Sequence, residues 1–147
     1  MAFTGNYACD VFKTGLLDGI YNFNTGTSDV YKIALYTNEA SLNQTTTSYT
    51  ITGETTGTGY TAGGEILVIN VTPTIGATGD IAYLSFADAV WSSVTITARG
   101  ALIYKYNGTT NPAVCVLDFG SNKSTTDGTF TVQFPSATNS SAIIRIS

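Results

Sequence analysis

Histidine is absent from this 147-residue sequence, and charged side chains of either sign are scarce. Without imidazole the chain cannot build a Ser-His-Asp triad or a Cys-His pair, and it lacks a principal zinc ligand. Ten acidic residues leave a two-carboxylate hydrolase formally open, but Glu39, Glu54 and Glu65 stand at loop edges rather than inside aromatic-rich strands. We therefore expect no enzyme activity, no cofactor and no metal site.

The few charges that are present have an acidic balance and no clustering. The formal net charge is −4, and the six basic residues are scattered along the chain. Neutralising nucleic-acid phosphates requires several cations on one face, so we expect no nucleic-acid partner. The longest apolar runs, such as residues 66–71, are strand-length, so we expect no membrane partner either.

Cysteine is nearly absent, and the first residues lack the features of an export signal. Residues 1–6 carry no basic segment and no long apolar run, so we expect synthesis in a reducing compartment. Cys9 and Cys115, the two cysteines, are therefore expected to be buried free thiols rather than a disulfide.

Threonine, serine, asparagine and glycine take the place of the missing charge. Threonine favours pleated, half-buried surfaces, and the other three favour tight turns. We predict one mainly β domain over residues 1–147, an antiparallel sandwich or jelly-roll-like barrel with one short N-terminal helix. The expected strands cover residues 30–36, 65–72, 81–86, 93–106, 113–119, 130–134 and 142–146.

The N-terminal segment of residues 1–23 is the only good helix candidate and could form an arm ahead of the sheets. Apolar residues recur at helical spacing between Cys9 and Phe23, although two glycines weaken the pattern. Residues 45–64 instead read as a long, mobile surface loop, because they are rich in threonine and glycine.

The strand of residues 93–106 predicts two further features. Gly100 in its middle indicates a bulge or bend, and Arg99 beside it needs an ionic partner if its face is covered. Asp118 on the next strand is the candidate partner, and exposure of Arg99 on an open sheet face is the alternative. Trp91 is expected in the core rather than on a sugar-stacking platform.

Six short segments form an ordered pattern along the chain. The segments are Gly-Tyr-Thr-Ala-Gly-Gly at 59–64, Phe-Ala-Asp-Ala-Val-Trp at 86–91, Thr-Ala-Arg-Gly-Ala-Leu-Ile-Tyr at 97–104, Val-Leu-Asp-Phe-Gly at 116–120, Phe-Thr-Val-Gln-Phe-Pro at 130–135 and Ala-Ile-Ile-Arg-Ile at 142–146. Taken in order, they resemble a group of small virion proteins of tailed bacteriophages, notably those of aquatic bacteria. The resemblance spans residues 3–147 and includes no catalytic motif.

This resemblance implies a virion component made in the cytoplasm of a bacterial host. An acidic protein would be repelled by packaged DNA, which favours the outer head surface. We expect a capsid decoration (cement) protein that bridges subunits of the major capsid protein, or of another virion protein, as a homo-oligomer and preferably a trimer. The alternative is a tail or fibre-associated subunit whose loop 45–64 contacts the host surface.

Five apolar residues of the N-terminal segment are the candidate assembly contacts. Each would contribute about 1.5–3 kcal/mol if it were buried against a partner. The alternative is that they cover one end of the domain's own core. The residues are Phe3, Tyr7, Phe12, Leu16 and Leu17.

Overall fold

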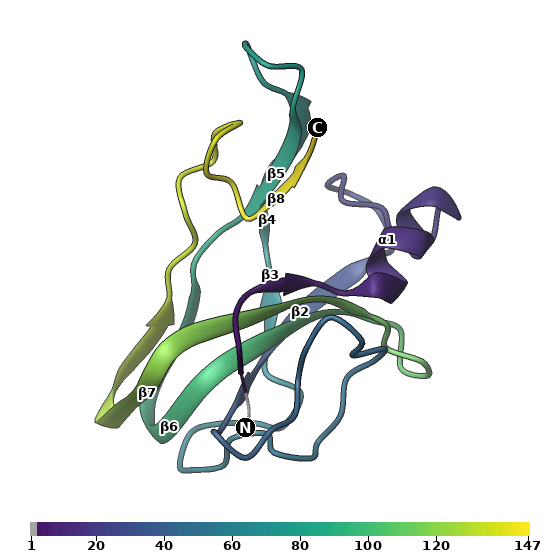
Figure 1. Ribbon diagram of the computed structural model, residues 1–147. Coiled ribbons are helices and arrows are strands. Elements are labelled where there is room, and N and C mark those ends of the chain that lie inside the picture. The colour runs from purple at the N-terminus through teal and green to yellow at the C-terminus, as the bar shows by residue number, and fades with distance from the viewer. Residues whose placement is uncertain (1–2) are drawn as a thin grey trace.

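The computed structural model describes residues 3–147, which form two antiparallel sheets and one short helix (Figure 1). One sheet has the strand order β1-β7-β6-β2-β3 and the other has the order β4-β5-β8. The sheets do not close into a barrel, so the predicted mainly β fold is confirmed in its sandwich-like form. The elements are β1 (Tyr7–Ala8), α1 (Asp10–Leu17), β2 (Val30–Tyr36), β3 (Glu65–Leu67), β4 (Ile69–Ile75), β5 (Ala82–Phe86), β6 (Ala89–Tyr106), β7 (Ala113–Val132) and β8 (Ile144–Ile146).

The long hairpin of β6 and β7 forms the central part of the large sheet. In the first half of β6, Val94, Ile96 and Ala98 are buried while Thr95 and Thr97 are exposed. This alternation has a period of two, because successive strand residues face opposite sides of a sheet. Beyond residue 100 both faces of the strand are covered, so alternation gives way to a continuous buried run.

The pairing of β6 with β7 is interrupted at Gly100, as the sequence predicted. The register shifts between Ala98 and Gly100. A Cβ atom on Gly100 would lie 2.4 Å from the carbonyl oxygen of Leu117 and 2.4 Å from the Phe3 ring. The glycine therefore allows the N-terminal Phe3 to pack directly on the sheet backbone.

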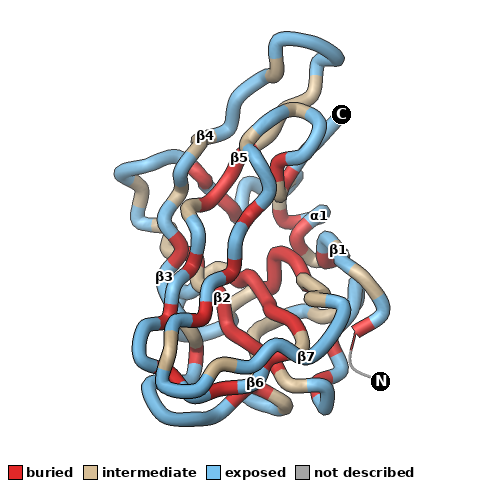
Figure 2. Tube along the Cα trace, turned by 90° about the vertical axis from the view of Figure 1, so that its left-hand side faces the viewer, coloured by how far each residue is buried: buried red, intermediate tan, exposed pale blue. Residues whose placement is uncertain are grey.

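The two sheets share one hydrophobic core, which contains buried residues of both. The chain passes directly from one sheet to the other. Strand β3 pairs with β2, and after Val68 the chain continues as β4, which pairs with β5. The carbonyl of Val68 accepts a 2.8 Å hydrogen bond from Ala87 at this crossing. Figure 2 shows the buried residues concentrated in the large sheet and extending into the base of the small one.

Helix α1 confirms the predicted N-terminal helix but is shorter than the apolar pattern. The chain turns away at Gly19, whose φ of 71° is left-handed, so Phe23 lies beyond the helix. Phe12 packs edge-to-face on Tyr21 with ring centroids 5.0 Å apart. Gly15 lets the helix approach closely, because a Cβ there would lie 2.4 Å from the Tyr21 ring.

Residues 37–64 cover part of the face of the large sheet that is opposite to helix α1 (Figure 1). Isolated bridges attach this segment to the sheets or their loops at Glu54, Ser48 and Thr58. Glu54 and Thr55 are buried, which corrects the expectation that residues 45–64 form only a surface loop. The reason is that the polar atoms of this segment find hydrogen-bond partners beneath it.

Arg99 and Asp118 form an ion pair across β6 and β7, which confirms the predicted partner. Each side chain is only 15% exposed, and the guanidinium lies 5.8 Å from the Phe3 ring centroid. Trp91 is buried against Phe130, so its predicted place in the core is also confirmed.

Candidate assembly surface

Burial separates the five predicted contact residues into three classes. Phe3 and Phe12 are buried in the protein's own core, the latter with 3% of its surface exposed. Tyr7 and Leu16 are partly buried against that core, and Leu17 is 91% exposed. Packing within the domain therefore accounts for Phe3 and Phe12, while the assembly role of the set stays a prediction.

Tyr7, Phe12 and Leu16 nevertheless meet in one groove of about 530 Å³. One wall of the groove comes from β1, α1 and the beginning of β7, and the other comes from the C-terminal residues 141–146. Strand β8 enters this wall because it pairs with β5 at the edge of the small sheet. Ile144 and Ile146 are predicted from the sequence only as part of the last strand, without a role in any site.

The groove continues along the small sheet into an apolar pocket of about 230 Å³. Phe12 and Leu16 line both spaces, together with Ile144 and Ile146 of β8. Cross-strand pairing places Ile75, Ala82 and Ile146 in one row across this sheet, and both isoleucines are exposed. A continuous apolar surface thus extends from the helix to the outer end of the small sheet.

The charged residues that line the groove are both cations. Lys13 and Arg145 contribute to its walls, and no Asp or Glu does. Lys13 is paired at 2.9 Å with the exposed Asp10, and Arg145 donates a 2.7 Å hydrogen bond to the carbonyl of Ser140. In a protein of net charge −4, Arg145 is thus the lining cation that has no acidic partner within residues 3–147.

Strand β8 is an edge strand of the small sheet. The order β4-β5-β8 leaves one side of β8 without a neighbouring strand in the described residues. An edge strand presents unpaired backbone groups to which a further strand can bind. The groove therefore combines apolar walls, two cations and a short free strand edge.

The two cysteines lie close to this groove, as buried free thiols. Burial, with a smaller contribution from Asp10, raises the pKa of Cys9 to about 11. Burial also raises the pKa of Cys115, which lines the groove. Both side chains therefore stay protonated at neutral pH and are poor nucleophiles.

Glu54 is the most conspicuous polar group that the sequence did not predict. Its carboxylate is buried, with 7% of the residue exposed, and accepts hydrogen bonds from the hydroxyls of Tyr49 and Tyr60 at 2.6 and 2.7 Å. The N–H of Gly63 donates a third bond at 2.7 Å. The sequence signal that could have revealed this site is a single acid, Glu54, between two tyrosines in a glycine-rich segment.

The tyrosines around Glu54 are held in their neutral form. Burial and the nearby carboxylate raise the pKa of Tyr49 and Tyr60 above the usual value. The same two causes raise the pKa of Tyr104 to about 12, and its hydroxyl donates to the carbonyl of Gly63 at 2.7 Å. This arrangement fastens residues 49–63 to the sheet and uses the carboxylate as a structural acceptor.

Residues 3–147 contain neither a metal-binding cluster nor a membrane-spanning helix. No group of three or more His, Cys, Asp or Glu side chains is placed to hold a metal ion. None of the helical structure in this range is long and apolar enough to span a membrane.

Comparison with known proteins adds no relative. No family model matches the chain, and neither a curated protein nor a solved structure is similar to it.

Proposed function

We propose that this protein is a non-enzymatic structural component of a virion. In this proposal it is a capsid decoration protein on the outer head surface that stabilises the shell by bridging capsid subunits. Each bound copy would stabilise the assembled shell because its affinity for the dispersed subunits is lower. The resemblance of residues 3–147 to small virion proteins of tailed bacteriophages motivates this proposal.

The groove between α1 and β8 is the observation that carries the proposal. It is apolar, it opens to solvent beside exposed isoleucines, and its lining includes Lys13 and Arg145 but no acid. Such a surface suits an extended apolar segment that carries a carboxylate and adds a strand beside β8. A segment of the major capsid protein, or of another virion protein, would be the occupant.

The charge of the whole chain supports a position outside the shell. A net charge of −4 opposes contact with packaged DNA, whereas the local cations of the groove favour an acidic protein partner. Binding would then depend on salt, because exposed charges are screened at high ionic strength.

The experiment adds the purified protein to particles of the encoding phage that lack it. We expect co-sedimentation at saturable stoichiometry, labelling of the head in electron micrographs, and DNA release at a higher temperature. Label on the tail, with unchanged heat resistance, would favour the tail or fibre role. Absence of any particle binding would overturn the proposal of a virion component.

A further inference from the structure

One end of the large sheet presents an apolar face with a cation at its centre. Lys32 of β2 lies opposite Ile66 of β3 and Tyr104 of β6, so these side chains share the face that residues 37–64 cover in part. Tyr104 is buried against Tyr49, and the other two side chains lie beyond the edge of that cover. Tyr106 belongs to the same face by alternation, and it is exposed. Ile66 and Val68 are each 64% exposed, which is high for large apolar residues. We call this surface the Lys32 face.

The charge of Lys32 has no counterion in the described chain. Its ammonium lies 5.1 Å from the ring centroid of Tyr106, and no carboxylate of residues 3–147 lies within 4.0 Å. Glu65 is adjacent to Ile66 in the chain, but alternation directs it to the other side of β3. The Lys32 face is therefore complementary to a carboxylate flanked by apolar side chains.

The end of α1 presents that complementary chemistry. Asp18 lies between Leu17, which is 91% exposed, and Ile20, which is also exposed. Within residues 3–147 the Asp18 carboxylate has no ion pair, whereas Asp10 at the start of the helix is paired with Lys13. We call Leu17, Asp18 and Ile20 the helix-end knob.

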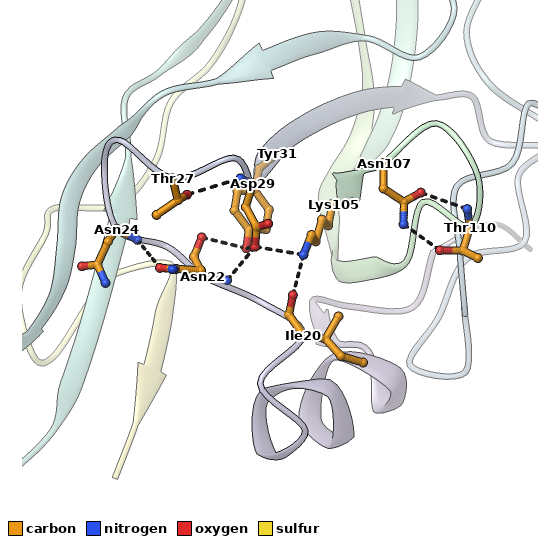
Figure 3. A network of polar contacts seen from close by, with 9 residues as sticks. All are labelled: Ile20, Asn22, Asn24, Thr27, Asp29, Tyr31, Lys105, Asn107 and Thr110. Atoms are coloured by element: carbon orange, nitrogen blue, oxygen red, sulfur yellow. Dashed lines mark hydrogen bonds and ion pairs between the residues drawn. The ribbon is translucent and has the colours of Figure 1, made fainter.

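Figure 3 shows how the knob is held in place. Lys105 of β6 donates a hydrogen bond to the carbonyl of Ile20 and forms a 2.9 Å ion pair with Asp29. Asp29 also accepts the N–H of Asn22 at 2.8 Å. The side chains of Lys105 and Asp29 are each only 16% exposed, so the segment after the helix is fixed to the sheet before any partner binds.

We propose that a second copy of this chain docks its helix-end knob on the Lys32 face and pairs its Asp18 with Lys32. This contact rests on the assembly role proposed above and names a partner and a surface for it. Lys105 and Tyr106 are successive residues of β6, so the knob and the Lys32 face lie on opposite sides of the same sheet end. The contact is therefore heterologous and can close into a ring, such as the trimer that we expect.

Charge reversal tests this contact in solution without any shell. We expect the wild-type protein to self-associate reversibly, as measured by light scattering and sedimentation over a concentration series. Lys32→Asp and Asp18→Lys should each raise the dissociation constant on the order of tenfold or more, because a like-charge pair replaces an opposite one. The double variant K32D/D18K should recover association, which a general loss of folding would not allow.

Matched variants distinguish this contact from nonspecific effects of charge. Lys123 of β7 and Asp80 of the turn between β4 and β5 are exposed charges outside the proposed contact. Lys123→Asp and Asp80→Lys should therefore leave association unchanged. A wild-type protein that stays monomeric at its highest soluble concentration would overturn the proposed contact. So would association that survives both single reversals. Neither result bears on binding to the shell, which the particle experiment measures separately.

Discussion

The two faces of the large sheet are covered in different ways. Residues 37–64 cover one face with a polar segment whose buried carboxylate, Glu54, has three donors within 2.7 Å. On the other face, α1 and the small sheet leave an apolar groove of about 530 Å³ between them. The buried polar atoms of the first cover are satisfied within the chain, and the cover leaves the Lys32 face open at one end of the sheet. The second leaves apolar surface in solvent, together with Arg145 and the Lys13–Asp10 ion pair.

This difference indicates where stability and association reside. A buried carboxylate tolerates little rearrangement, since each lost donor leaves the charge less compensated. Exposed apolar side chains, in contrast, contribute little to the folded monomer and gain free energy only when a partner covers them. Substitutions of Glu54 or of its hydrogen-bond donors should therefore affect folding, and substitutions of exposed residues beside the groove should affect binding.

Removing the Glu54 carboxylate should have the largest effect on folding. Glu54→Leu leaves the hydroxyls of Tyr49 and Tyr60 and the N–H of Gly63 without their acceptor. We expect the free energy of unfolding to fall by about 4 kcal/mol, measured by urea denaturation. Glu54→Gln keeps one acceptor oxygen and should cost less. The exposed Glu39→Gln is the control, and similar losses for Glu39 and Glu54 would contradict the structural role of the buried acid.

Truncation at two positions of α1 should separate folding from association. Phe12→Ala removes a buried ring and should lower the free energy of unfolding by about 3 kcal/mol. Leu17→Ala removes an exposed side chain and should change it by less than about 0.5 kcal/mol, while weakening self-association. Calorimetry and sedimentation of the two variants check this contrast. Equal destabilisation by both would contradict it.

A smaller effect should appear only at high pH. The pKa values of Tyr21 and Tyr104 are raised to about 12 by burial, whereas both side chains ionise near 10 in the unfolded chain. Their neutral forms therefore stabilise the fold fully below pH 10, and this contribution is lost as the pH rises from 10 to 12. Melting temperatures across this range should fall together with the appearance of tyrosinate absorbance. Ionisation of all tyrosines near pH 10 in a folded protein would contradict their burial.

The sequence predicted features that depend on local pattern. The irregularity at Gly100 and the pair of Arg99 with Asp118 follow from residues on two consecutive strands. The burial of Glu54 could not be predicted this way, because it depends on how a glycine-rich segment folds back over the sheet. The groove escaped prediction because the β1–β7 and β5–β8 pairings bring the two ends of the chain together.

Binding of two matched variants to particles that lack the protein tests the central claim most directly. Ile146→Asp places a carboxylate in the exposed rim of the groove, and Ile51→Asp does the same at an exposed isoleucine of the covering loop. With folding unchanged in both, measured by circular dichroism and urea denaturation, the account predicts low particle occupancy for Ile146→Asp. Ile51→Asp should bind like the wild type. Equal occupancy for the two variants would contradict docking through the groove.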